Sequence, residues 1–391
     1  MRLIKSHYLN DGKLFNDGRP VDLIRIEKEE DYDVLLNNII SSGYYDLSYF
    51  NSHIDYREGE VKFDAFFHAS ILKFLKSKSL LELGCGRGDV LFLLGLDRRI
   101  KVRGIEFSQD VLKTVWPSLS GKVDYGDVME VCKKYHPRKI TFDTFCAFDL
   151  WEHILPERLQ NYIASLVALA EKDALFFFTI PAFGEDQVFG EVFPLEFEEN
   201  RGKFNARAPF DHLIVESKEP PVPVMGHLIC AHSEWWQKQF ERHGLVRAEA
   251  LERNIHCYFD EHLFYAKKSF YIFYLDSPEA RRRVNKLTQK SLTLYRKWKL
   301  LVDLQEFIGR FIKKQGGSFI EREELKLTIH HAEFYMLLDL KKRLNAWTGE
   351  FQGRAEPGLS RQLLQTLSNK LTDKCLDAYI RIFRKRHYLI K

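Results

Sequence analysis

The residues whose types and spacing best suit chemistry lie in one short segment, LLELGCGRGD at positions 80–89. Three glycines would let the backbone approach a ligand closely and turn from a strand into a helix; they are Gly84, Gly86 and Gly88. The N–H groups at the start of that helix would face an anionic group of the ligand, such as a carboxylate. Glu82 and Asp89 flank the glycines and favour a ligand that also carries positive charge.

The same loop distinguishes between two classes of nucleotide ligand. A nicotinamide-dinucleotide fingerprint has glycine or alanine three residues after its second glycine, where this chain has Asp89. Neighbouring carboxylates suit a pyrophosphate poorly, but they suit S-adenosylmethionine (SAM), which carries an ammonium and a sulfonium. The loop therefore favours SAM over NAD.

Two further acidic residues follow strand-like segments. Glu106 ends the second expected strand, where a carboxylate can accept both hydroxyls of a ribose. Asp127 follows the third strand and could accept from an adenine amino group, with Val128 packed on the ring; its alternative role is the N-cap of the next helix. Ligands of open parallel sheets bind beyond the carboxyl ends of the strands, where all these residues would lie.

Histidine is the natural base for activating a hydroxyl near neutral pH. His153 follows the fourth strand, and His227 closes a later insertion; each is a candidate base or a structural histidine. Glu152 could orient either imidazole or hold its own loop. Weaker candidates are His212 and Asp211. The spacing matches no recognised metal signature, so no metal is expected, although Glu152, His153, His227 and Asp211 could converge on one.

The elements that must position these residues alternate between strand-like and helix-like patterns. Strands are expected at 79–83, 101–106, 123–125, 142–148 and 174–180, and helices at 89–96, 108–116, about 156–169 and 233–243. This alternation predicts a parallel sheet with helices on both faces. Two more strands, roughly 245–255 and 264–275, are expected to pair antiparallel and complete a sheet of seven strands.

Three regions are expected along the chain. Residues 1–78 form an N-terminal extension or lid, with a helix from Lys62 to Lys76 and an aromatic patch of Tyr44, Tyr45, Tyr49 and Phe50. Residues 79–276 form the ligand-binding domain, interrupted at 181–226 by a proline-rich insertion without clear periodicity. Residues 277–391 form an α-helical domain, because apolar residues recur there at a three/four spacing.

Composition is that of an ordinary soluble protein: 391 residues, 45% hydrophobic, net charge +4. No signal peptide or membrane span is expected, and six cysteines without a CxxC pair argue against zinc or a disulfide framework. We expect a cytoplasmic protein, at most peripheral at the inner face of the membrane. The range 281–391 has 25 Lys and Arg against 11 Asp and Glu, which indicates either an anionic partner or a solvated helical face.

In order along the chain, LLELGCGRGDV, GIEFS, GDV and FDLWEHI resemble the motifs of class I SAM-dependent methyltransferases. The resemblance spans about 60–275 and implies a Rossmann-like α/β fold. It also implies that SAM is lined by Glu82, Gly84, Cys85, Gly86, Gly88, Glu106, Phe107, Asp127, Val128, Phe148 and Asp149. A looser resemblance, to methyltransferases found with bacterial polysaccharide functions, lies in YYDLSYF, EHI, TIPAF and GHLICAHSEWWQKQFERHGL.

These resemblances imply O-methylation of a sugar hydroxyl in a glycan or glycolipid precursor, with S-adenosylhomocysteine as second product. One of Trp235 and Trp236 is then expected in the core, and the other is a candidate for stacking on a sugar face. Alternatives are a small-molecule or protein methyltransferase with a helical dimerisation domain, which would make a homodimer, and a non-catalytic scaffold. Methylation of a nucleic-acid amine is less expected, because Phe-Asp-Leu-Trp-Glu-His stands where such enzymes have an Asn/Asp-Pro-Pro-aromatic segment.

Overall fold

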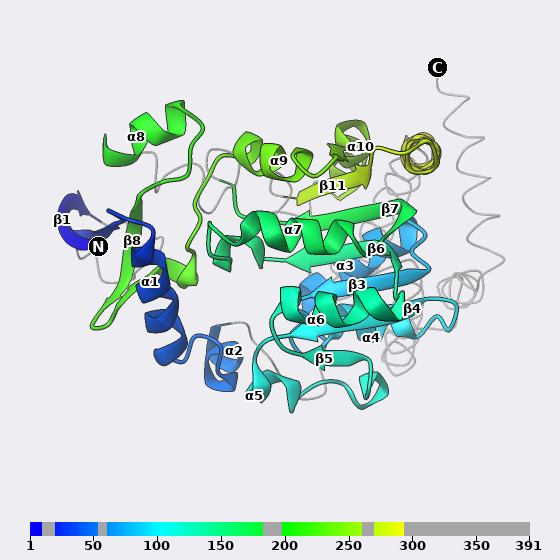
Figure 1. The fold of residues 1–391 in the computed structure, drawn as a ribbon, viewed down its shortest axis with the longest axis horizontal. Coiled ribbons are helices and arrows are strands. Elements are labelled where there is room, and N and C mark those ends of the chain that lie inside the picture. The colour runs from blue at the N-terminus through cyan, green and yellow to red at the C-terminus, as the bar shows by residue number, and fades with distance from the viewer. Residues whose placement is uncertain (10–19, 54–60, 183–197, 260–269, 293–391) are drawn as a thin grey trace, which may run out of the picture.

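Two β-sheets organise the described part of the chain, a large one and a small one that lie side by side (Figure 1). The computed structural model describes residues 1–9, 20–53, 61–182, 198–259 and 270–292. The expected helical domain beyond 292 lies outside the described residues, as does the expected strand start at 264. Among the residues described, no helix combines the length and apolar character that a bilayer span requires.

The large sheet has seven strands in the order β10-β11-β7-β6-β3-β4-β5. Five of them are mutually parallel: β3 (Ser79–Leu83), β4 (Lys101–Glu106), β5 (Val123–Tyr125), β6 (Phe142–Phe148) and β7 (Ala170–Thr179). At one edge, β11 (Phe270–Leu275) runs antiparallel to β7, and β10 (Leu245–Arg247) runs antiparallel to β11. The expected seven-stranded α/β sheet is confirmed.

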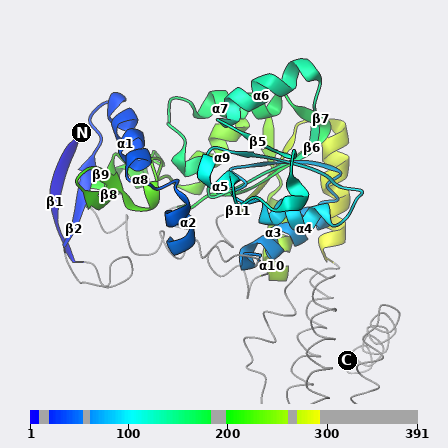
Figure 2. The same ribbon diagram turned by 90° about the horizontal axis from the view of Figure 1, so that it is seen from below.

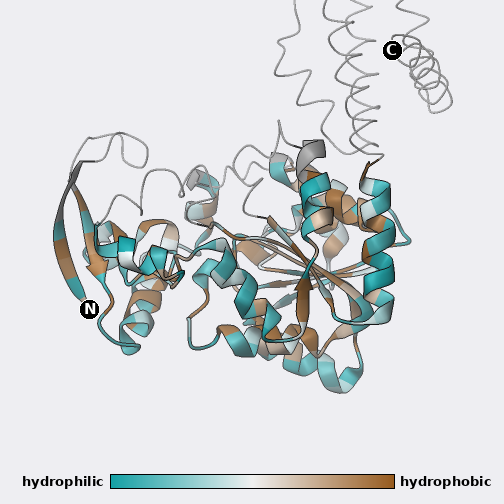
Figure 3. Ribbon diagram, turned by 90° about the horizontal axis from the view of Figure 1, so that it is seen from above, coloured by the Kyte–Doolittle hydropathy of each residue, from teal (hydrophilic) through white to brown (hydrophobic). Residues whose placement is uncertain are grey.

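Helices cover both faces of this sheet, as Figure 2 shows. One face packs against α6 (Val128–Tyr135), α7 (Leu159–Val167) and α9 (Ser233–Glu241). The other packs against α3 (Phe63–Phe74), α4 (Asp89–Gly95) and α10 (Glu249–Phe259). Alternate residues of β7 serve the two cores: Phe176 and Phe178 join the first, Leu175 and Phe177 the second. Figure 3 accordingly shows hydrophobic strands inside and hydrophilic residues on the outer helices.

The prediction of a strand over 245–255 was wrong beyond residue 247. The strand stops at Arg247, and helix α10 follows. Leu251 and Ile255, one helical turn apart, are both fully buried against the sheet. Glu252 pairs with Arg247 at 3.0 Å and accepts the backbone N–H of Ile272, so this carboxylate joins the helix to the strand β11. The four-residue spacing of Leu251 and Ile255 is that of a helix, not the two-residue alternation of a strand.

The small sheet joins the N-terminal extension to the insertion. Its four antiparallel strands are β1 (Arg2–Leu9), β2 (Pro20–Arg25), β8 (His212–Lys218) and β9 (Pro221–Pro223), with β2 paired to β8. Helix α1 (Glu30–Ser41) packs on it through Leu35 and Ile39. The described part of the insertion therefore has regular structure. Its strands give no clear sequence pattern because they are short, and β8 pairs with a strand far away in the sequence.

Shorter elements complete the described residues. They are α2 (Leu47–His53), α5 (Gln109–Leu112), α8 (Glu198–Asn205), and the 3-10 turns η1 (Pro117–Leu119), η2 (His136–Arg138), η3 (Trp151–His153) and η4 (Val224–Gly226). A helix that follows β11 runs from 278 to the end of the described residues at 292. Arg283 holds this helix against the large sheet by donating to the backbone carbonyls of Asp143 in β6, Asp173 in β7 and Leu75, which follows α3.

Candidate functional site

The glycine loop, residues 84–88, connects β3 to α4 at the carboxyl edge of the large sheet. All three glycines have positive φ, 60° at Gly84, 55° at Gly86 and 81° at Gly88. A Cβ atom on Gly88 would lie 2.5 Å from Leu119 Cδ1, and one on Gly84 would lie 3.1 Å from Leu150 Cδ1. The tight strand-to-helix turn expected from the sequence therefore forms, and it requires glycine for both conformation and space.

Two buried carboxylates lie beside the glycine loop. Glu82 is 4% exposed, and among the described residues its Oε2 has no hydrogen-bond partner. Burial raises the pKa of Glu82 well above its usual range, and the negative charges of Asp89 and Glu106 add to this effect. Glu106 accepts the backbone N–H of Gly86 at 2.7 Å and that of Ser108 at 2.8 Å. Burial still raises the pKa of Glu106, although these bonds oppose the shift.

Asp127 has the N-cap role that the sequence left as its alternative. One carboxylate oxygen accepts the N–H groups of Met129 and Glu130 at 2.9 and 3.3 Å, and the other accepts the hydroxyl of Tyr162. Val128 next to it is buried in the core. An adenine amino group would therefore have to share the Asp127 carboxylate with the backbone N–H groups and the Tyr162 hydroxyl that it already accepts.

The remaining residues implied for the cofactor differ in their surroundings. Phe107 is 49% exposed beside the loop. Phe148 is stacked on the imidazole of His68, with ring centroids 3.7 Å apart. Asp149 has a φ of 52° and accepts the hydroxyl of Thr179. Cys85 is buried, and a Cβ on Gly104 of the neighbouring strand would lie 2.6 Å from its Sγ. Burial also raises the pKa of the Cys85 thiol, which keeps it protonated.

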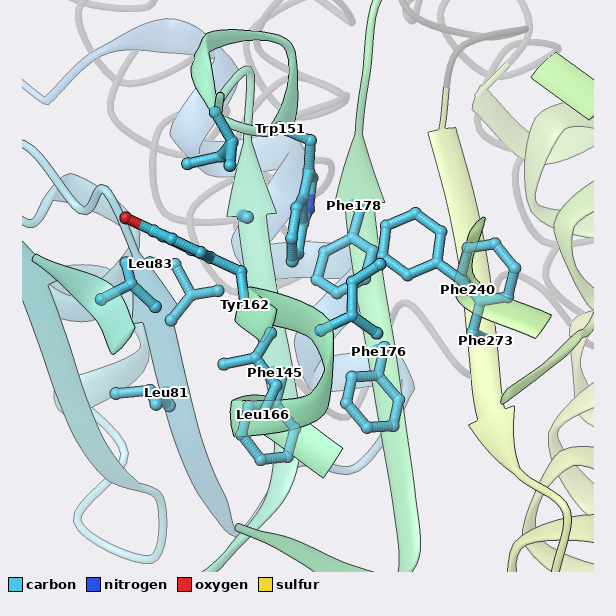
Figure 4. Close-up of a cluster of buried hydrophobic side chains, with 14 of the residues drawn as sticks. Leu81, Leu83, Phe145, Trp151, Tyr162, Leu166, Phe176, Phe178, Phe240 and Phe273 are labelled. Carbon is cyan, nitrogen blue, oxygen red and sulfur yellow. The ribbon is translucent and has the colours of Figure 1, made fainter. Parts of the chain in front are cut away.

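A second group of polar side chains follows the next strand of the sheet, β6. The turn η3 carries Glu152 and His153, and its first residue, Trp151, is fully buried. Figure 4 shows Trp151 inserted among the aromatic residues of the core, beside Phe178 and Phe240. Its ring lies 5.0 and 5.1 Å from these two, edge to face. Trp151 therefore anchors the turn and fixes where Glu152 and His153 point.

His227 completes this group from the insertion. Its Nε2 lies 3.8 Å from Glu152 Oε1, and Nε2 of His153 lies 3.9 Å from the same oxygen. The two imidazoles are 5.0 Å apart and nearly perpendicular. The backbone carbonyl of Glu152 accepts the N–H groups of Leu228 and Ile229, which holds the insertion against η3. We call Glu152, His153 and His227 the histidine–carboxylate cluster.

Burial determines the protonation of both histidines in the cluster. It lowers the pKa of His153 to about 4, an effect that the bond to the Gly226 carbonyl only partly offsets. It lowers the pKa of His227 well below the usual range, with His153 adding to the effect. Both imidazoles are therefore neutral at pH 7, but they are weak bases.

The other residues considered from the sequence lie elsewhere. Asp211 pairs with His212 at 2.8 Å and with Lys203 at 3.1 Å, next to the small sheet, and is not part of the cluster. Trp236 is fully buried, and Trp235 is packed partly buried beside it. Trp236 is therefore the core residue of the pair.

Tyr45 is a residue of the site whose role the sequence did not reveal. It follows α1, and its ring packs 6.1 Å from Phe107 and 6.4 Å from His153. Ser108 donates its hydroxyl to the Tyr45 backbone carbonyl. Burial is the main cause that raises the pKa of the Tyr45 phenol, and the charges of Glu152 and Glu106 add to it. Tyr45 thus lies between the glycine loop and the histidine–carboxylate cluster. The only sequence signal for this position was the aromatic patch in YYDLSYF.

No family model and no curated protein matches the chain. Among the solved structures similar to it, an SAM-dependent methyltransferase from Clostridium acetobutylicum ATCC 824 is 14% identical, over 61% of this chain and 98% of its own, with a TM-score of 0.35. Another, from Archaeoglobus fulgidus, is 15% identical over 54% of this chain and 93% of its own, with a TM-score of 0.33. The function is therefore inferred from the residues of the site.

Proposed function

We propose that this chain is a SAM-dependent methyltransferase that methylates a sugar hydroxyl in a glycan or glycolipid precursor. The observation that best supports the cofactor is the buried Oε2 of Glu82 beside the glycine loop. A buried carboxylate oxygen without a partner is costly, and a cationic ligand group would offset that cost. SAM brings both an ammonium and a sulfonium, so it fits this set of side chains.

The residues that would hold SAM are the glycine loop, Glu82 and Glu106. Each Glu106 oxygen accepts one backbone N–H and retains capacity to accept from a ribose hydroxyl. When bound, SAM would supply its methyl group to an acceptor oxygen: the carbon–oxygen bond forms, the carbon–sulfur bond breaks with its electron pair left on sulfur, and S-adenosylhomocysteine and a proton are released. The protein would mainly align donor and acceptor.

The histidine–carboxylate cluster supports a hydroxyl as the acceptor. It follows β6, the strand next to β3 in the sheet, so it lies close to the glycine loop. Side chains that bind or deprotonate a hydroxyl are of these types. The looser sequence resemblance to polysaccharide-associated methyltransferases supports a sugar as the molecule that bears this hydroxyl.

Calorimetric titration with SAM and S-adenosylhomocysteine tests the cofactor, with NAD as the control ligand. We expect both sulfur compounds to bind and NAD not to bind. Glu82→Gln should weaken SAM binding roughly ten- to hundredfold, because a charge-assisted interaction is lost. The matched control is Glu130→Gln on the exposed side of α6, which should leave affinity unchanged. Absence of binding by the unmodified protein would refute the proposal.

Transfer of a labelled methyl group to a panel of acceptors tests the substrate. Products on saccharides and glycolipids would support the sugar hydroxyl, and products only on phenols or proteins would favour the alternative enzyme class. SAM binding without transfer to any acceptor would favour a scaffold.

We further propose that the basic range 281–391 holds the protein near anionic headgroups. Salt-sensitive binding to anionic vesicles would support this proposal, and a stable homodimer without vesicle binding would favour the dimerisation role.

A further inference from the structure

The histidine–carboxylate cluster has the dimensions of a metal site. One ligand atom from each of Glu152, His153 and His227 can be chosen so that all three lie within 4.8 Å of one another. A first-row divalent metal bonds such atoms at about 2.0–2.2 Å, which places neighbouring ligand atoms roughly 3 to 3.5 Å apart. The two imidazole nitrogens are 3.8 and 3.9 Å from Glu152 Oε1, so small side-chain rotations would close the site.

The tautomer of His153 is set by its neighbour. Nδ1 lies 3.1 Å from the backbone carbonyl of Gly226, and a carbonyl oxygen can only accept. Nδ1 must therefore carry the hydrogen in the neutral ring, which leaves the lone pair on Nε2, the atom nearest Glu152. Two electron-rich atoms, an imidazole lone pair and a carboxylate oxygen, thus face each other, and a cation between them would attract both.

The contact with Gly226 also has the form that orients metal-bound histidines. Such histidines donate their second ring N–H to a carbonyl or carboxylate, which fixes the ring and raises its basicity. Gly226 has a φ of +69°, and a Cβ there would meet the His153 ring at 3.5 Å and Tyr44 at 3.3 Å. The positive φ favours glycine at this position, and it is this backbone conformation that presents the carbonyl to the imidazole.

A metal ion at this position would supply the chemistry that a hydroxyl acceptor needs. It lowers the pKa of a bound hydroxyl directly, so that no side chain has to act as the base. Three protein ligands leave coordination positions open, as in catalytic rather than structural metal sites.

We propose that Glu152, His153 and His227 bind one divalent first-row transition-metal ion, of the Zn²⁺ or Mn²⁺ type, whose open position takes the acceptor hydroxyl. Two imidazoles favour such ions over Mg²⁺ and Ca²⁺, which prefer oxygen ligands. The hydroxyl oxygen bonds the metal and its proton passes to water. This role of the ion rests on the proposed function, whereas its binding does not.

Metal binding is measured on the full chain, stripped with a chelator, without SAM or acceptor. Titration with ZnCl₂ or MnCl₂ should show one metal ion bound tightly per chain, and MgCl₂ should not displace it. We call this ion the bound equivalent. His227→Ala and Glu152→Gln should each weaken that equivalent at least a hundredfold. His243→Ala is the matched control. This histidine lies just beyond α9 and hydrogen-bonds Gln160 of α7, so its replacement should leave metal binding unchanged.

A second measurement needs no variant. X-ray absorption of the Zn²⁺-loaded, unmodified protein should show two imidazoles among the metal ligands. No stoichiometric binding, an equivalent unaffected by both cluster variants, or a spectrum without imidazole would overturn the proposal. Because SAM is absent throughout, failure of methyl transfer and failure of metal binding are separate results.

Discussion

The glycine loop and the histidine–carboxylate cluster lie at the same edge of one sheet but are built in different ways. The glycine loop is local: β3 and β4 are adjacent strands, and Glu106 of β4 holds the backbone of Gly86. The cluster joins residues from η3 to the insertion, and His153 is 73 residues from the Gly226 carbonyl that orients it. A site made by backbone conformation forms once its own segment has folded, whereas a site made by side chains from distant segments forms only when those segments pack together.

The largest effect that would sharpen this comparison is expected from Trp151→Ala. Removing a fully buried tryptophan should lower the free energy of unfolding by about 3–5 kcal/mol and release η3. In the protein that remains folded, metal binding should be lost, while SAM affinity should stay within about twofold because the glycine loop does not depend on this anchor. Denaturant unfolding and calorimetry measure the two quantities.

Trp151→Phe is the control for that experiment, since it keeps an aromatic ring between Phe178 and Phe240. It should cost less stability and retain the metal equivalent. Equal loss of SAM affinity and metal affinity in Trp151→Ala would mean that the two regions form one unit, contrary to the comparison.

A smaller effect is expected from pH, through His68 of α3, whose imidazole stacks on Phe148 at the end of β6. Burial, aided by Lys62, lowers the pKa of His68 from 6.5 to about 3. The unfolded chain therefore takes up this proton first as the pH falls, so the stability that His68 contributes is complete above about pH 6.5 and is lost toward pH 3. At pH 5 the loss should be about 2 kcal/mol relative to pH 8.

His68→Phe keeps a ring stacked on Phe148 and removes the titration. Its unfolding free energy, followed by urea denaturation between pH 8 and pH 5, should fall less steeply than that of the unmodified protein. Identical slopes would show that His68 is not the group responsible.

The smallest effect is expected from Tyr45→Phe, which removes one hydroxyl between the two regions. Because this phenol lies near both Glu106 and Glu152, we expect a loss of less than about fivefold in SAM affinity and in turnover alike. The exposed Tyr125 provides the control, Tyr125→Phe, which should change neither. A change in only one of the two quantities would assign Tyr45 to that region alone.

The seven-stranded sheet and the glycine loop were predictable from the sequence because their signals are local. Continuous apolar runs such as that of β7 identify buried parallel strands, and glycines after β3 identify the turn. The expected strand over 245–255 was wrong in its second half, where Leu251 and Ile255 are separated by three polar residues, which is the spacing of one helical turn.

The site itself was predictable only in part. His153, His227 and Glu152 were recognised as candidates by residue type, but they converge because the Glu152 carbonyl accepts the N–H groups of Leu228 and Ile229, and no local pattern encodes this contact. Likewise, the N-cap geometry of Asp127 and the position of Tyr45 follow from packing between distant segments. Residue types identify candidate members of a site, but only the tertiary contacts determine which candidates lie together.

The pairing of β2 with β8 has a consequence for synthesis on the ribosome. Strand β2 ends at Arg25, but its partner begins at His212, after all five parallel strands have been made. The nascent chain can assemble the glycine loop and pair β1 with β2 while the other edge of β2 still lacks its partner β8. An unpaired strand edge can pair with another chain. Slow translation before residue 212 should therefore increase aggregation of the nascent chain through β2.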